Sequence, residues 1–166
     1  GWNSVVLCAD GSRLFAENSS VVVVWESADG SEVVRHHPRP NRPKILVRDV
    51  EIGPFGRRLA VTWADRDIAT SHVLDLENGE IYPTGSSERP VGTDFSRDGG
   101  TLAVRMTVRN IHVHQTDPPR QTAVLEGHSG VVSDAVYLDD GRLVSISEGV
   151  VHIRAGGRDA PIGSLM

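Results

Sequence analysis

The chain has 166 residues, enough for a domain with a hydrophobic core, and its 39% apolar and 23% charged residues exclude a disordered chain. Its formal net charge of −5 offers no general attraction to nucleic acid. The single cysteine, Cys8, excludes an intramolecular disulfide and favours a cytoplasmic location. No apolar run approaches the roughly 18 residues of a membrane helix, so we expect no membrane span.

A short apolar strand, a turn with glycine and a leucine that opens a second strand recur along the chain. The first copy reads Val-Leu-Cys-Ala-Asp-Gly-Ser-Arg-Leu and ends at Leu14, and later copies end at Leu59, Leu102 and Leu143. The turn glycines are Gly11, Gly56, Gly99 and Gly141, separated by 45, 43 and 42 residues. A tight hairpin needs a positive φ at this position, which glycine adopts without a Cβ clash.

Further β-rich segments follow each leucine in chain order, at 21–25, 72–76, 110–114 and 150–154. A looser apolar strand comes next, as at 122–125 and 161–165. Four short strands in each unit of about 42 residues, without a helical apolar period, predict the blades of a β-propeller. The valine run 21–24 fits a strand that is covered on both faces. A β-sandwich with regular turn spacing is the alternative.

The fourth unit resembles a WD40 repeat. Gly127-His128 matches the Gly-His signature of that family, and the stretch 148–154 is similar to its Asp-Gly-Thr-Val-Arg-Leu-Trp segment. The first unit ends in Trp25-Glu26, which is similar to the Trp-Asp dipeptide. His114 and Arg154 stand where the family has tryptophan, and the second unit, at 75–80, more closely resembles the propeller repeats of TolB and the prolyl-oligopeptidase family.

The resemblance implies an all-β fold, a single β-propeller segment of four four-stranded antiparallel blades. We expect the blades at about 1–37, 45–84, 90–126 and 127–166, with a basic, proline-rich linker at 35–44. Because WD40 propellers usually have seven or more blades, we expect the chain to be part of a larger ring. A closed four-blade ring and a ring completed by a second copy are alternatives, and open blade edges favour self-association.

The resemblance also implies a non-catalytic scaffold that mediates protein–protein interactions without a cofactor. The alternative is an accessory propeller of a larger enzyme, for example a gating or substrate-recognition domain of a serine peptidase. A propeller that is itself catalytic or metal-binding needs converging histidine and acidic side chains, and the sequence shows no such set.

Two groups of polar residues bear on catalysis. His128, Ser145 and Glu148 are the residue types of a catalytic triad, but no Gly-x-Ser-x-Gly motif surrounds Ser145, and the family resemblance implies a buried structural network instead. His112 and His114 share one face of a strand, yet two histidines without further ligands predict no metal site.

The linker is the most unusual segment. It contains Arg35, Arg39, Arg42 and Lys44 with three prolines and no acidic residue, which suits an extended segment that binds phosphate or an acidic protein segment. A solvated linker between blades is the alternative. It has no aromatic side chains to stack on bases, so nucleic acid is disfavoured. Strands alternate in direction, so the linker and the hairpin residues Asp65, Arg66 and Asp67 should share one rim and form the partner-binding site.

Overall fold

The computed structural model describes residues 2–18, 20–37, 46–65, 68–84, 89–155 and 161–165, the last stretch for its backbone alone. Within these ranges the chain is all-β, with sixteen strands and no helix. The strands form four antiparallel sheets, each built from four strands that are consecutive in sequence.

We name these sheets A to D in chain order. Sheet A contains β1 (Ser4–Leu7), β2 (Arg13–Glu17), β3 (Val22–Glu26) and β4 (Glu32–His36). Sheet B contains β5 (Leu46–Ile52), β6 (Arg58–Ala64), β7 (Ala69–Asp75) and β8 (Ile81–Pro83). Sheet C contains β9 (Pro90–Phe95), β10 (Thr101–Met106), β11 (Ile111–Thr116) and β12 (Pro119–Leu125). Sheet D contains β13 (Val132–Tyr137), β14 (Arg142–Ser147), β15 (Val150–Ala155) and β16 (Pro161–Leu165).

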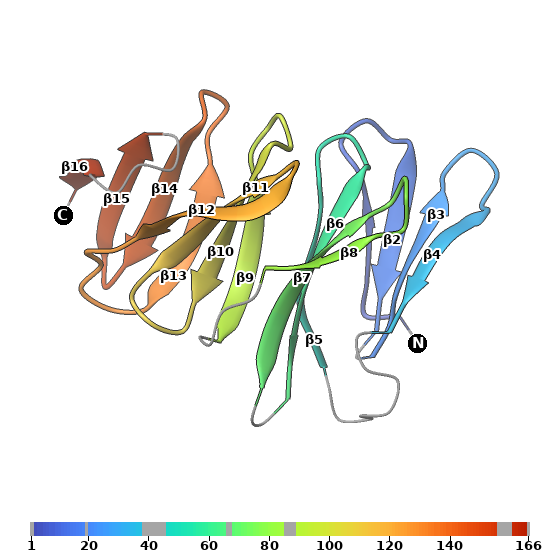
Figure 1. Ribbon diagram of the computed structural model, residues 1–166, viewed down its shortest axis with the longest axis horizontal. Coiled ribbons are helices and arrows are strands. Elements are labelled where there is room, and N and C mark those ends of the chain that lie inside the picture. Colours follow the sequence, from blue (N-terminus) through green and yellow to red (C-terminus); the bar gives the residue numbers. More distant parts are fainter. Residues whose placement is uncertain are drawn as a thin grey trace.

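The four sheets lie in a row in chain order, from sheet A at the right of Figure 1 to sheet D at the left. The first strand of sheet B lies beside the first strand of sheet C, and that strand lies beside the first strand of sheet D. Four sheets in a row differ from the two stacked sheets of a sandwich. The arrangement is consistent with a propeller, and the described sheets do not close into a ring.

The first hairpin of each sheet repeats the same turn. All four turn glycines have positive φ values, between 63° and 82°, which confirms the prediction. Each donates its backbone N–H to the carbonyl three residues earlier, at 2.8–2.9 Å; the acceptors are Cys8, Gly53, Ser96 and Leu138. Side chains repeat as well, because Cys8 Sγ donates to Asp10 at 2.7 Å and Ser96 Oγ donates to Asp98 at 2.6 Å. Cys8 is therefore the counterpart of a serine in this turn.

Three apolar clusters join the neighbouring sheets. Between sheets A and B, Val22 and Val24 pack with Trp63, and all three side chains are at most 1% exposed. The valine run 21–24 is fully buried, as predicted for a strand covered on both faces. Two further clusters join sheet B to sheet C and sheet C to sheet D.

Alternation along the second strand decides which residues face which neighbour. Leu59, Leu102 and Leu143 pack toward the preceding sheet, whereas the next residues, such as Ala60 and Ala103, pack toward the following sheet. Each sheet thus has a preceding face and a following face, and the two outermost faces belong to sheets A and D.

Candidate functional site

The predicted partner-binding residues fall only partly within the described structure. Arg39, Arg42, Lys44, Arg66 and Asp67 lie outside the described residues. Arg35 is exposed on β4 and pairs with Glu32 at 2.5 Å, and Asp65 Oδ1 accepts a hydrogen bond from the Ile68 N–H at 2.7 Å.

The strand register does place the flanks of both predicted loops at one end of sheet B. Leu46, which follows the linker, lies opposite Ala64, and Ala64 lies opposite Ala69 across the β6–β7 hairpin. The first-hairpin turn, at 53–57, lies at the other end of β5. That the linker binds an acidic partner stays a prediction.

His128 and Ser145 are brought together at the junction of sheets C and D. His128 Nε2 lies 2.9 Å from Ser145 Oγ, and His128 Nδ1 lies 3.1 Å from the carbonyl oxygen of Arg109. A carbonyl can only accept, so Nδ1 carries the proton and Ser145 donates to Nε2. Burial lowers the pKa of His128 to about 4, which keeps the ring neutral. Ser145 is 0% exposed, so the pair ties strands together and presents no nucleophile to solvent.

Glu148 was predicted to join this network, and the structure places the residue at the surface. It is exposed in the β14–β15 turn, with a φ of 48°, and its carboxyl group lies against Gly130. Two buried side chains nearby, Ser147 and Arg154, contact backbone groups of the segment that connects sheets C and D. Ser147 Oγ accepts from the Gly130 N–H at 3.0 Å, and the buried Arg154 donates to the Glu126 carbonyl. His152 adds an edge-to-face ring contact with His128, at 4.7 Å between ring centroids.

The two histidines of β11 are core residues. His112 and His114 are 6% and 7% exposed, and burial lowers the pKa of His114 to about 4. Among the described residues, no three His, Cys, Asp or Glu side chains are grouped so that they could hold a metal ion.

Carboxyl groups on the first strands link neighbouring sheets. Asp49 accepts from the Thr93 N–H at 2.7 Å and from the Thr93 hydroxyl at 2.8 Å. Glu51 accepts from the Phe95 N–H at 3.0 Å, and Asp94 accepts from the Tyr137 N–H. Glu51 and Asp94 occupy the same position, five residues before the turn glycine of their sheets. The two carboxyl groups therefore make the same contact at successive junctions, Glu51 between sheets B and C and Asp94 between sheets C and D.

A cavity opens where the turn-to-turn contact between neighbouring sheets is missing. A Cβ at Gly56 would lie 3.1 Å from Ser12 Oγ of sheet A, and one at Gly99 would lie 3.5 Å from Pro54 of sheet B. A Cβ at Gly141 would meet no atom within 4 Å. The first-hairpin turns of sheets C and D are thus held apart, and a cavity of about 600 Å³ lies there.

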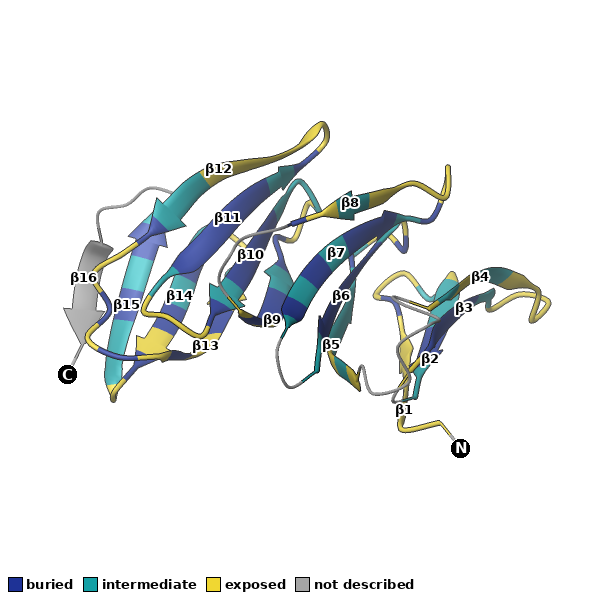
Figure 2. Cartoon of the chain, turned by 60° about the horizontal axis from the view of Figure 1, so that its bottom comes forward, coloured by how far each residue is buried: buried dark blue, intermediate teal, exposed yellow. Residues whose placement is uncertain are grey.

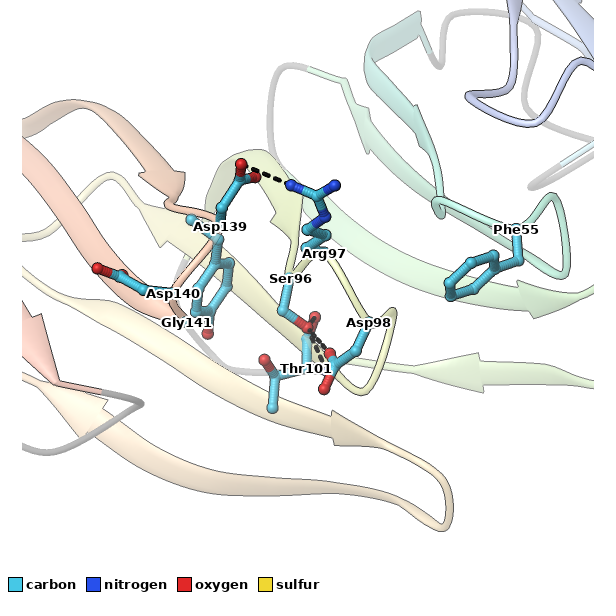
Figure 3. Close-up of a pocket in the computed structure, with 9 residues that line it drawn as sticks. Phe55, Ser96, Arg97, Asp98, Thr101, Asp139, Asp140 and Gly141 are labelled. Carbon is cyan, nitrogen blue, oxygen red and sulfur yellow. Dashed lines mark hydrogen bonds and ion pairs between the residues drawn. The ribbon is translucent and has the colours of Figure 1, made fainter.

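The cavity collects charged and aromatic side chains from three sheets. Its lining residues are Phe55, Ser96, Arg97, Asp98, Thr101, Tyr137, Asp139, Asp140 and Gly141. Figure 3 shows Phe55 on the sheet B side, facing the turns of sheets C and D. Arg97 bridges the two turns by pairing with Asp139 at 2.5 Å, although both side chains are at least 70% exposed. Phe55 is 57% exposed, an unusual position for an aromatic side chain.

The cavity is negatively charged. Hydrogen bonds from Ser96 and from the Gly100 N–H lower the pKa of Asp98, and a hydrogen bond from the Arg142 N–H lowers that of Asp140. Burial raises the pKa of Tyr137, so this phenol is neutral. Its lining has three carboxylates; Arg97 pairs with Asp139 and Arg142 pairs with Asp140, so the surplus negative charge is that of Asp98. This surplus makes the cavity complementary to a cation.

Sequence reasoning missed this cavity and selected the opposite rim. A signal was present, because the turns Arg97-Asp98 and Asp139-Asp140 repeat charged residues directly before their glycines. An aspartate directly before a turn glycine is explained by its local hydrogen bonds alone, so the pattern does not point to a binding site. The opening between the turns depends on packing, which the sequence pattern does not contain.

No protein-family model matches the chain, and no curated protein matches it either. No helix in the described part of the chain is long and apolar enough to cross a membrane.

Proposed function

We propose that the chain is a non-catalytic protein-binding module of the WD40-type β-propeller class, in which sheets A to D are four blades of a larger ring. The row of four antiparallel sheets supports this proposal, as do the repeated turn geometry and the carboxyl contacts between first strands. The single cysteine, a buried thiol, supports a cytoplasmic location.

We further propose that the cavity between the turns of sheets C and D holds a cationic side chain of a protein partner. The observation that carries this proposal is the exposed Asp139 beside Asp98 and Asp140, with the exposed ring of Phe55 opposite. An arginine side chain would pair with the carboxylates and stack on the aromatic ring, and both contacts favour arginine. An accessory propeller of an enzyme would use the same surface, and would differ in sharing a polypeptide with its partner.

Binding of labelled peptides tests the cavity. A fluorescein-labelled Gly-Arg-Gly-Arg-Gly peptide should bind, and its Gly-Glu-Gly-Glu-Gly counterpart should not. Asp139→Asn should weaken the arginine peptide on the order of fivefold, as expected for about 1 kcal/mol from an exposed ion pair.

Asp117→Asn is the matched control, because Asp117 is 82% exposed against 83% for Asp139 and also pairs with an arginine. Equal affinity for the two peptides, or equal losses in the two variants, would refute the proposed cavity function.

A further inference from the structure

The following face of sheet D is uncovered and apolar. Val136 lies opposite Val144, Val144 lies opposite Ile153, and Ile146 lies opposite Val151, so these five side chains share one face. Val136 and Ile146 are 43% and 38% exposed. The equivalent face of sheet C is buried against sheet D through Ala103, Ile111 and Val113.

Sheet D is also more apolar than sheet C at two equivalent positions. Where sheet C has Asp94 and Arg105 on its following face, sheet D has Val136 and Ile146. The valine and isoleucine leave no charge to be desolvated when another sheet covers this face.

The preceding face of sheet A is the other uncovered face. Leu7 and Val5 are 56% and 65% exposed, and β1 is exposed along its whole length (Figure 2). Counting back from the turn glycine, Leu7 is equivalent to Phe95, and Val5 to Thr93. Phe95 and Thr93 are only 6% and 9% exposed, because sheet B covers them.

An arginine directly before the leucine reaches the following sheet at two of the three junctions. Arg13 of sheet A donates to the Gly56 carbonyl in the turn of sheet B at 2.7 Å, and Arg58 of sheet B donates to Thr116 of sheet C at 3.3 Å. Arg142 is the equivalent residue of sheet D, directly before the leucine. Its side chain is 44% exposed and pairs with Asp140 of its own turn at 2.8 Å.

We propose that the following face of sheet D binds the preceding face of sheet A in a second copy of this chain, so that copies joined head to tail supply the further blades of the proposed ring, on which this inference rests. The contact continues the packing seen between sheets A and B, B and C, and C and D. Val136 and Ile146 cover Leu7 and Val5 of the second copy, and Arg142 reaches the carbonyl of its Gly11 as Arg13 reaches that of Gly56. Such an interface is heterologous, with different surfaces on the two copies.

Solution mass by light scattering over a dilution series tests this contact on residues 1–166. The wild-type chain should have a mass above that of one chain at high concentration. Leu7→Asp and Val136→Asp place an acid in the interface from either side, and each should reduce the mass to one chain. Val108→Asp is the control, because Val108 is 42% exposed on the β10–β11 loop and should leave the mass unchanged.

Mixing the two variants separates a head-to-tail contact from a symmetric one. Leu7→Asp keeps an intact sheet D and Val136→Asp keeps an intact sheet A. In an equimolar mixture, sheet D of the first variant should bind sheet A of the second, so pairs of chains joined by one such contact should form. A wild-type chain with the mass of one copy throughout, a mixture that stays at one copy, or either variant retaining the wild-type mass would overturn the proposal.

Two further measurements keep the test valid if an acidic variant fails to unfold cooperatively. Leu7→Ser and Val136→Ser replace the acids, and Arg142→Ala removes the arginine contact without adding charge. Arg142→Ala should shift dissociation to higher concentration, and an unchanged dilution curve would contradict the assigned contact. Leu7 and Val136 do not line the cavity, so their variants test the head-to-tail contact separately from cation binding, whereas Arg142 pairs with the cavity residue Asp140.

Discussion

Replacement of Glu51 by glutamine should change how the stability of the protein depends on pH. Glu51 Oε1 accepts from the Phe95 N–H, and Oε2 is buried beside the Asp94 carboxyl group. Burial above all, with the charges of Asp94 and Asp49, raises the pKa of Glu51 to about 8, although the Phe95 hydrogen bond lowers it. The raised pKa favours a protonated Glu51 at neutral pH, and we expect Asp94 to accept this proton in a hydrogen bond.

The magnitude follows from the difference between the folded and unfolded pKa. Below about pH 4.5 the group is protonated in both states and its contribution to stability is complete; the contribution is lost as the pH rises through 8. At 1.36 kcal/mol per unit, the ceiling is about 5 kcal/mol. Burial also raises the pKa of Asp94, which has Arg105 and Asp134 nearby. Glu51 and Asp94 therefore titrate as a coupled pair, and the effect on stability is divided between them. We expect a loss of about 2 kcal/mol between pH 5 and pH 9.

Urea unfolding followed by tryptophan fluorescence at pH 5, 7 and 9 measures this loss, with the buried Trp63 as a reporter. Glu51→Gln keeps an N–H donor toward Asp94 at every pH, so the wild type should lose about 2 kcal/mol relative to this variant between pH 5 and pH 9. Glu77→Gln, at an exposed ion pair with Arg57, is the control and should follow the wild type. Parallel profiles for Glu51→Gln and the wild type would refute the shared proton.

Three further variants test the fold by urea unfolding. Cys8→Ser should keep the free energy of unfolding within about 1 kcal/mol of the wild type, because Ser96 makes the same contact in the turn of sheet C. Cys8→Ala should lower it by about 1–2 kcal/mol, and equal losses in the two variants would contradict the equivalence of Cys8 and Ser96. Trp63→Ala, at a side chain 1% exposed between sheets A and B, should lose about 3–5 kcal/mol, and a loss below about 1 kcal/mol would contradict the packing of these sheets. Ser145→Ala should cost about 1–3 kcal/mol and Ser133→Ala, at an exposed hydroxyl, much less. Burial depresses the pKa of His128 in the folded state, so its contribution to stability is present above pH 6.5 and is lost as the pH falls toward 4. The opposing contribution of Glu51 is absent from Glu51→Gln, so an unchanged stability of that variant across this range would argue against a neutral buried His128.

The local structure was largely predictable from the sequence. The glycine turns and the alternation around each leucine are short-range signals, and the strands at 22–26, 69–75, 111–116 and 150–155 follow the predicted segments closely. Such signals depend on backbone conformation and on burial within a single unit. They therefore survive in one sequence without any comparison.

Contacts between units were predicted less well. Glu148 was placed by its likeness to an aspartate of the WD40 repeat, but the glutamate sits in a tight turn and faces solvent. The pairing of Glu51 with Asp94 had a signal, an acid at the same position of two apolar strands, but its meaning depends on the distance between sheets. The cavity depends on the gap at Gly141, which no pattern within one unit encodes.

The most direct test of the central claim is a map of backbone amide chemical shifts during titration with N-acetyl-arginine amide. The account predicts that the largest changes fall on residues 96–101 and 137–141 and on Phe55, and that Asp139→Asn reduces them. Changes that cluster at other exposed carboxylates such as Asp117, or no saturable change at all, would contradict a cation-binding cavity between sheets C and D.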